Sequence, residues 1–198
     1  MTTASARGTS RPAGTPLGRQ EVVTAVLTSA ADLFADRGPS ATSIRDIAAH
    51  SRVNHGLIHR HFGTKDQLVG AVLDHLARHL ADLIAEDSDG GRISAAVDRQ
   101  LRVIARVSLD GYQIGELQRR FPTMEILVEA VKARHPSEQD ARLAAAHTIA
   151  LQMGWCLFGG FLRASTGLED LDDRTFARSV GETVLKILEP GPSVPQRA

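Results

Sequence analysis

The sequence contains one cysteine, few aromatic side chains and no long apolar run, and each of these shortages excludes a class of protein. Cys156 cannot form a disulfide within the chain, and its isolation favours a reducing compartment. Aromatic residues make up 4% of the 198 residues, which suits an all-helical core rich in alanine and leucine. Because no uninterrupted run of about 18 apolar residues and no apolar N-terminal segment is present, we expect neither membrane spanning nor secretion.

The motifs that carry catalysis and cofactor binding are also missing. The sequence has no glycine-rich nucleotide loop, no zinc-protease motif and no nucleophile elbow, so we predict that the chain is not an enzyme and binds no cofactor. His75 and His79 lie four residues apart, a spacing compatible with a metal, but without an identifiable third ligand a solvated pair is favoured and no metal site is predicted. Cys156 lies in an apolar run, which indicates a small core residue rather than a reactive thiol.

The net charge is zero, but the charges are unevenly distributed. Residues 1–65 hold eight Lys and Arg against four Asp and Glu, a balance of +4, and the remainder has a balance of −4. A basic end joined to an acidic body suits an anionic partner at the basic end. Chance asymmetry is the alternative when the charge is considered alone.

Residues 41–65 carry the pattern of two short helices joined by a tight turn. Ser43 begins the first helix as an N-cap, with an acid three residues further on. Asn54 begins the second, on which Ile58 and Phe62 share the buried face because they are four residues apart. Two short helices with such a turn are typical of a helix-turn-helix, whose second helix enters the DNA major groove.

The other side chains of the second helix suit contact with DNA. We expect His55, Leu57 and His59 to lie nearest the base edges, where Leu57 could meet a thymine methyl group. Lys65 adds a full charge at the N-terminus of the following helix, a natural phosphate site. The complete predicted DNA-contact set is Ser43, Asn54, His55, Gly56, Leu57, His59, Arg60, His61 and Lys65.

Periodicity and turn residues divide the chain into about nine helices and predict an all-α fold. We expect a disordered arm at 1–16, a three-helix helix-turn-helix domain at 17–65, a helical domain at 66–190 and a tail at 191–198. Such an arm can reach into the DNA minor groove, but more often it makes no contact. The helices expected after the turn cover 65–85, 93–107, 112–120 and 123–134, with two more starting after Ser137 and at Asp172 or Asp173.

The last two predicted helices carry an unusually large apolar surface. From Thr148 to Leu162 the polar side chains are limited to Thr148 and Gln152, and a helix that is apolar all round must be buried on more than one side. We therefore predict a four-helix bundle formed by two helices from each of two subunits, the alternative being that both helices close the core of a monomer. The predicted dimer contacts are Leu151, Trp155, Phe158, Leu162, Phe176, Val180 and Val184.

The segment VNHGLIHRHFGTKDQL resembles the recognition-helix signature of the TetR/AcrR family of bacterial regulators. The resemblance is strong over about residues 22–76, and the rest matches only in length and helical character. Arg52 stands where a turn glycine is usual, His59 replaces the usual tyrosine and Ser51 replaces a common alanine. The residues that match the signature in register are Val53, Gly56, Ile58, His61, Phe62, Lys65 and Leu68.

The resemblance implies a cytoplasmic, nucleoid-associated homodimer that binds a near-palindromic operator in double-stranded DNA and represses transcription until a small molecule releases it. It also implies an effector cavity among the C-terminal helices. Two alternatives remain: a helical-bundle enzyme or small-molecule carrier with a non-functional helix-turn-helix, and an architectural DNA binder without an effector. The residues that could line the cavity are Gln100, Tyr112, Met124, Thr148, Gln152 and Trp155.

Overall fold

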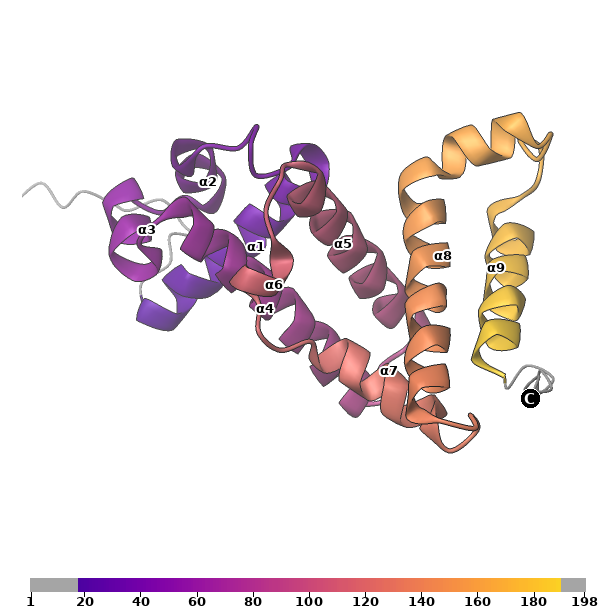
Figure 1. Cartoon of the computed structure of the whole chain (residues 1–198). Coiled ribbons are helices and arrows are strands. Elements are labelled where there is room, and N and C mark those ends of the chain that lie inside the picture. Colours follow the sequence, from indigo (N-terminus) through magenta and orange to yellow (C-terminus); the bar gives the residue numbers. More distant parts are fainter. Residues whose placement is uncertain (1–17, 190–198) are drawn as a thin grey trace, which may run out of the picture.

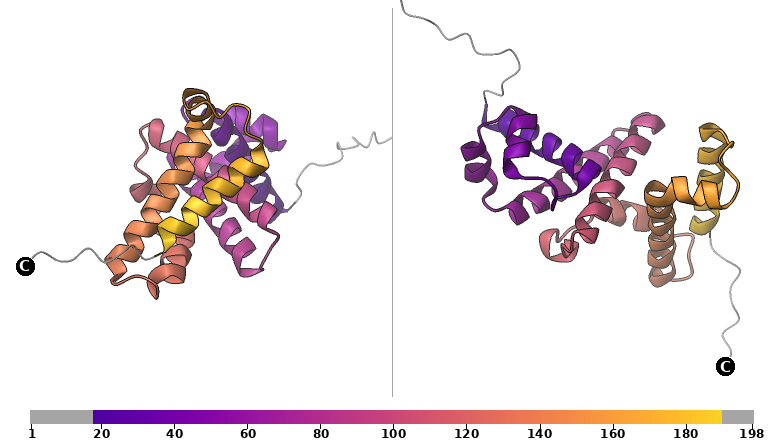
Figure 2. Two further views of the ribbon diagram at one scale, coloured as in Figure 1. Left: turned by 90° about the vertical axis from the view of Figure 1, so that its right-hand side faces the viewer. Right: turned by 90° about the horizontal axis from the view of Figure 1, so that it is seen from above.

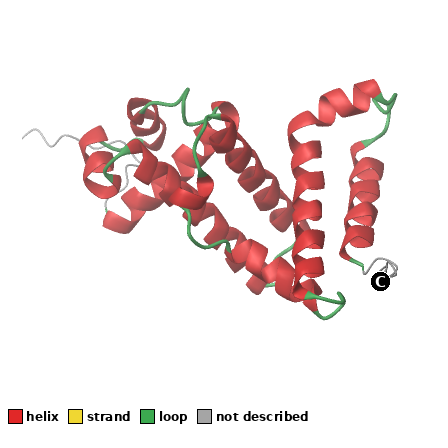
Figure 3. Ribbon diagram, in the orientation of Figure 1, coloured by secondary structure: helices red, strands yellow, loops and turns green. Residues whose placement is uncertain are grey.

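The computed structural model describes residues 18–189, and this part of the chain forms nine helices and no strand (Figures 1 and 3). The all-α prediction is therefore confirmed. The predicted arm and the whole of the predicted tail lie outside the described residues. The helices are α1 Arg19–Arg37, α2 Ile44–Ser51, α3 His55–Phe62, α4 Lys65–Ala85, α5 Gly90–Leu109, α6 Ile114–Leu117, α7 Pro122–Lys132, α8 Glu138–Ser165 and α9 Asp173–Leu188.

The first three helices gather around a closed apolar core. Phe34 of α1, Ile47 of α2 and Ile58 of α3 are almost fully buried in it. The same core takes in the first half of α4 and the second half of α5, including Leu68 and Val103. The helix-turn-helix unit is therefore completed by the two helices that also lead away from it.

Helix α4 spans the molecule from the small N-terminal helices toward α7 and α8 (Figure 1). Its N-terminal half belongs to the core under α1, and its C-terminal half packs against α5 and α7. At Gly70 the Leu117 carbonyl of α6 lies 3.0 Å from where a Cβ atom would stand. A glycine at this position thus permits α6 to lie directly on α4.

Helices α8 and α9 cover the end of the molecule opposite the helix-turn-helix unit, as the left view of Figure 2 shows. In α8 the buried residues lie between 141 and 148, and none of the residues of α9 is buried. Within the described residues, α8 is the one helix long and apolar enough to cross a membrane, judged by length and composition alone. Its C-terminal half bends away from the rest of the helix (Figure 1).

Most predicted helix boundaries agree with the structure, and three need correction. Helix α5 starts at Gly90, three residues earlier than expected, because Asp89 caps it through the Gly91 N–H at 2.9 Å. Helix α6 covers only 114–117, since Gln118 already has an extended backbone. Helix α7 starts at Pro122, which is suited to the first turn, and ends at Lys132, two residues before the expected end.

Candidate nucleic-acid interface

The turn between α2 and α3 is fixed by contacts on its buried side. Arg52, which follows α2, has φ 55° and ψ 31°, a left-handed conformation that favours glycine. Val53 is buried beside it, and its N–H donates to the Ala48 carbonyl at 3.1 Å. The Ser51 hydroxyl donates to the Ile47 carbonyl at 2.6 Å. These bonds set the direction in which α3 leaves α2.

Helix α3 has one buried side and one exposed side. Asn54 caps it by accepting a hydrogen bond from the Gly56 N–H at 2.8 Å, and Ile58 enters the core. Leu57 stays 37% exposed among polar neighbours, which suits an apolar contact such as a thymine methyl group. The exposed residues of the cap and helix are Asn54, His55, Gly56, Leu57, His59 and Arg60.

The three remaining predicted contacts flank this exposed side. His61 is half-buried, with its ring edge-on to that of Phe62 at 6.4 Å. Lys65 is half-buried in the first turn of α4, where unbonded N–H groups favour an anion. The Ser43 hydroxyl accepts from the Asp46 N–H at 3.1 Å, which leaves its own proton free to donate. Since α2, α3 and the start of α4 lie together at one end of the molecule, all nine predicted residues lie there (Figure 1).

Asp46, an acid at this end of the molecule, is compensated by its neighbours. The Ser43 N–H donates to Asp46 Oδ2 at 2.9 Å, and the Arg37 guanidinium lies 3.2 Å from the same oxygen. The hydrogen bonds from Ser43 hold the pKa of this carboxyl below its usual value, and the charge of Arg37 acts in the same direction. The carboxylate therefore caps α2 without presenting an uncompensated negative charge to an anionic partner.

Polar contacts tie α5 to the helix-turn-helix unit at two points. The Arg99 guanidinium donates to the Thr28 carbonyl at 2.9 Å and to Asp32 Oδ1 at 2.6 Å, both on α1. At the far end of α5, Asp110 Oδ2 accepts from the Ser40 N–H at 2.6 Å, in the connection between α1 and α2. A displacement of α5 would therefore be transmitted to α1 as well as to α4.

A cavity of about 240 Å³ lies between α4, α5, α7, α8 and α9. Tyr112 does not line it and packs instead against the core under α1, where burial, followed by the charges of Asp66 and Asp110, raises its pKa. Trp155 also lies outside it, with its ring edge-on to that of Phe176 at 4.8 Å. The other four residues predicted for an effector pocket line this cavity: Gln100, Met124, Thr148 and Gln152.

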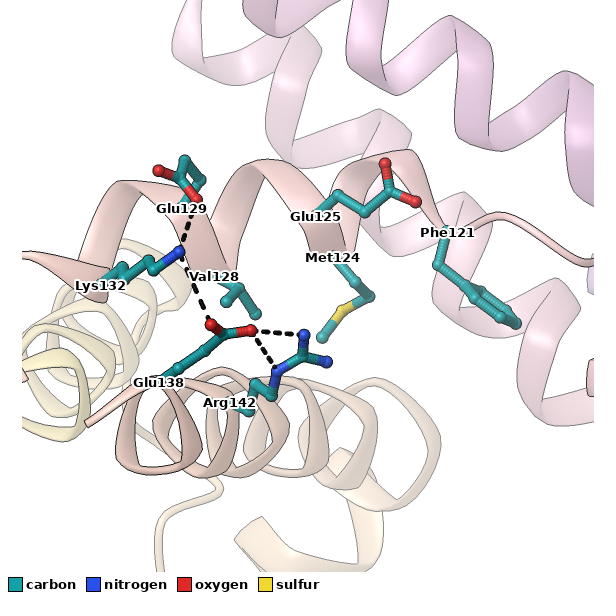
Figure 4. Close-up of a pocket in the computed structure, with 8 residues that line it drawn as sticks. All are labelled: Phe121, Met124, Glu125, Val128, Glu129, Lys132, Glu138 and Arg142. Carbon is teal, nitrogen blue, oxygen red and sulfur yellow. Dashed lines mark hydrogen bonds and ion pairs between the residues drawn. The ribbon is translucent and has the colours of Figure 1, made fainter.

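A second pocket, of about 300 Å³, opens between α7 and α8 (Figure 4). Four of its five charged side chains pair with one another: Glu138 lies 2.6 Å from Arg142 and 3.6 Å from Lys132. The hydrogen bond from Arg142, followed by the charge of Lys132, lowers the pKa of Glu138. Lys132 also lies 3.8 Å from Glu129. Because these charges already compensate each other, this pocket is a weaker candidate for a ligand than the cavity.

The predicted dimer contacts lie on the poorly covered helices α8 and α9. Phe158 and Phe161 of α8 are 56% and 70% exposed, and Leu185 of α9 is 60% exposed. Trp155 and Phe176 join α8 to α9 within one protomer. The predicted residues that are half-buried are Leu151, Trp155, Leu162, Phe176, Val180 and Val184, of which the last also lines the cavity.

The histidine pair His75 and His79 and the single cysteine, Cys156, lie outside these sites and show no sign of metal binding or catalysis among the described residues. Burial, followed by the nearby charge of His79, lowers the pKa of His75, and among residues 18–189 no group of three or more His, Cys, Asp or Glu side chains could hold a metal. The Cys156 thiol donates to Asp98 Oδ1 at 3.2 Å. Burial raises its pKa to about 11, so it is protonated and unreactive at neutral pH.

Two residues of this arrangement carried no signal in the sequence. Gln118 is 2% exposed and lines the cavity from the extended segment after α6. Arg99 holds α1 from a position that the sequence alone places on an ordinary amphipathic helix. Both depend on how distant helices pack, which local periodicity does not encode.

The sequence is similar to those of known bacterial regulators. Residues 26–72 match the family described as bacterial regulatory proteins, tetR family. The chain is 55% identical over 175 residues to the HTH-type transcriptional repressor Rv3405c of Mycobacterium tuberculosis, over 88% of this chain and 93% of that protein. It is 46% identical over 48 residues to the HTH-type transcriptional repressor KstR2 of Mycolicibacterium smegmatis, over 24% of this chain and 23% of that protein.

A solved structure of a TetR-like transcriptional regulator from Rhodococcus sp. RHA1 is also similar. The two chains share 18% sequence identity and superpose with a TM-score of 0.51, over 87% of this chain and 96% of the other. At this identity the likeness concerns the fold alone.

Proposed function

The chain belongs to the TetR family of bacterial regulatory proteins and is a DNA-binding transcriptional regulator, and on this premise we propose that it is a homodimeric repressor released from DNA by a small molecule. The proposal includes no catalytic activity, because the cavity is lined by no charged side chain that could serve as a general acid or base. Its place of action would be the cytoplasm, on the nucleoid.

The exposed side of α3 carries this proposal. A short helix with Ile58 in the core and polar side chains outward is the form that the major groove admits. His55, Leu57 and His59 would lie nearest the bases. Ser43, Arg60, His61 and Lys65 would contact phosphates, and Asn54 and Gly56 would hold the helix start close to the backbone.

Dimerisation would follow from the exposed apolar side chains of α8 and α9. Phe158 leaves more than half of its side chain uncovered in one protomer, and burying such groups against a second copy removes apolar surface from water. Two copies of α3 would then read a near-palindromic operator with half-sites roughly 34–36 Å apart or slightly more.

The cavity would be the effector site. A ligand there can release the operator only if it binds two spacings of the reading helices with different affinity. Helix α4 lines the cavity and also packs in the apolar core that α1, α2 and α3 share. Helix α5 places Gln100 in the cavity and Arg99 against α1. The unit at 17–65 would thus read DNA, while 66–190 would sense the ligand and join the subunits.

A gel shift with the DNA upstream of the protein's own gene tests the proposal. We expect a discrete shifted band that disappears with His55→Ala combined with His59→Ala, since both side chains lie on the exposed side of α3. His79→Ala, an exposed histidine in the C-terminal half of α4, is the matched control and should shift the DNA as the unchanged protein does. A double variant that binds the same DNA with unchanged affinity would remove α3 from the reading role.

A further inference from the structure

The cavity between α4, α5, α7, α8 and α9 is lined mostly by apolar side chains, with five uncharged polar residues among them. Its apolar walls include Leu80 of α4, Leu101 and Ile104 of α5, Leu127 of α7 and Leu188 of α9. None of the lining residues is charged. An ionised ligand entering such a site would lose its hydration without gaining a partner charge, which disfavours anions and cations alike.

Three buried polar side chains interrupt this apolar wall: Gln100, Thr148 and Gln118, the last of which is 2% exposed. Gln100 of α5 is 8% exposed and Thr148 of α8 is 3% exposed, and both line the cavity. The Gln100 Oε1 atom and the Thr148 Oγ1 atom have no hydrogen-bond partner among the described residues of the protein. Buried polar atoms nearly always have a hydrogen-bond partner, so we expect a molecule in the cavity to supply one for Gln100 Oε1 and Thr148 Oγ1.

The chemistry of the two groups restricts that partner. An amide oxygen can only accept a hydrogen bond, so Gln100 Oε1 requires a donor, whereas a threonine hydroxyl can donate or accept. A hydroxyl or N–H group on a ligand would satisfy Gln100, and the oxygen of the same hydroxyl could accept from Thr148. A ligand with only acceptor atoms would leave Gln100 unpaired.

We propose that the effector is a small, neutral, largely apolar molecule that carries a hydroxyl or N–H donor, bound through Gln100 Oε1 and Thr148 Oγ1. This inference rests on the proposed function, because it assigns a ligand class to the same cavity. The volume of about 240 Å³ accommodates a fused pair of aromatic rings or an aliphatic body of similar size.

A basic surface pocket provides the rival chemistry. It lies between α4 and the segment that joins α6 to α7, and its lining includes Arg78, Arg119 and Arg120. A ligand that used these guanidinium groups would be an anion and would not enter the uncharged cavity. The preference between neutral and anionic ligands therefore distinguishes the two sites.

Three naphthalene probes of similar shape test the proposal by calorimetric titration of the full-length protein. 2-Naphthol is neutral and has a donor, 2-methoxynaphthalene is neutral without a donor, and 2-naphthoate is an anion. We expect 2-naphthol to bind about tenfold tighter than 2-methoxynaphthalene, and 2-naphthoate to bind about a hundredfold weaker than 2-naphthol. Equal or tighter binding of 2-naphthoate, equal binding of the two neutral probes, or no binding of any probe would overturn the proposal.

Two variants locate the binding. Gln100→Leu and Thr148→Val each remove one unpaired polar atom at nearly constant volume, so each should weaken 2-naphthol binding about fivefold or more and leave 2-methoxynaphthalene binding unchanged. Each should also raise the melting temperature of the ligand-free protein, because an unsatisfied buried group is lost. Gln139→Leu, an exposed glutamine on α8, is the control and should change neither affinity. Unchanged 2-naphthol affinity in both variants would place the probe elsewhere and refute the assignment.

DNA binding is measured on the same ligand-free samples, so that failure of the ligand class and failure of the proposed function remain distinct. A protein that binds its upstream DNA but prefers 2-naphthoate retains the regulatory function and loses the neutral-donor assignment. A protein that prefers 2-naphthol but does not bind DNA retains the cavity assignment and loses the regulatory function.

Discussion

The two ends of the molecule differ in how far one chain can complete its own core. At the helix-turn-helix end, Phe34, Ile47 and Ile58 are almost completely buried. At the other end, α9 has no buried residue, and Phe158 and Phe161 are mostly exposed. At the helix-turn-helix end a single chain buries its own hydrophobic core, whereas the other end leaves an apolar surface that a second subunit could cover.

This difference follows the work proposed for each end. A reading helix must keep a fixed geometry against DNA, and a closed core with capped helices provides it. A dimer surface must instead stay apolar and uncovered in the single protomer, so that the second subunit can bury it. The connection between the ends consists of α4 and α5, so these helices are where a ligand could alter the spacing of the two reading helices.

The largest expected effect comes from a matched pair of phenylalanine substitutions. Phe34→Ala should destabilise the protein by about 3–5 kcal/mol, because it opens a cavity in the closed core. Phe161→Ala, at a position 70% exposed in the protomer, should leave the core intact and lower the melting temperature mainly at low protein concentration. Thermal unfolding across a concentration series measures both. A concentration-independent loss of several kcal/mol from Phe161→Ala would break the comparison.

The second test compares lysines at the two ends. Lys65→Ala should weaken binding to all duplex sequences about tenfold per subunit at roughly 0.1 M salt, and should flatten the dependence of log K on log salt by about one unit for each subunit. Lys132, which is paired with Glu129 and Glu138 at the α7–α8 end, is the control. Lys132→Ala should leave the slope unchanged. An unaltered slope for Lys65→Ala would remove Lys65 from the interface.

The third test addresses the connection between the ends. Arg99→Ala removes the contacts of α5 with Thr28 and Asp32, and should reduce the effect of 2-naphthol on DNA affinity about fivefold. Arg102 pairs with Asp98 within α5, so Arg102→Ala should preserve the ligand effect. Fluorescence anisotropy of labelled DNA with and without 2-naphthol provides the measurement. An equal ligand effect in the Arg99→Ala protein would show that α5 does not transmit the change through this contact.

The smallest expected effect concerns the turn before α3. Arg52→Gly relieves a left-handed backbone conformation and should stabilise the protein by roughly 0.5–1 kcal/mol, after the greater freedom of glycine in the unfolded chain is subtracted. Asp87, after α4, has φ 51° and offers a matched control at the other side of the molecule. Asp87→Gly should give a similar gain in urea unfolding. A loss of stability confined to Arg52→Gly would mean that the arginine side chain compensates for its backbone strain.

Local signals predicted the helix-turn-helix end from the sequence. The predicted caps at Ser43 and Asn54 each involve residues two or three positions apart, and both form in the structure. The same reasoning identified Asp172 as one of two possible caps of α9, and the structure selects it. Interactions between residues this close in the sequence can be predicted without knowledge of the tertiary structure.

Tertiary packing decided what the sequence could not. The short α6 lies directly on α4 at Gly70, where the Leu117 carbonyl leaves little room for a Cβ atom. Arg99 pairs with Asp32 of α1, which is 67 residues away in the sequence. Thr148 was recognisable as a polar residue in an apolar helix, but the cavity that it shares with Gln100 required the structure. The composition of α8 predicted a large apolar surface without showing which part of it one protomer covers.

The mass of the protein–DNA complex in solution tests the central claim most directly. Light scattering of the full-length protein bound to a duplex from its own upstream region should give two chains per operator, or a multiple of two. A complex with one chain per duplex, or no complex at low salt, would contradict a paired reading helix held by α8 and α9.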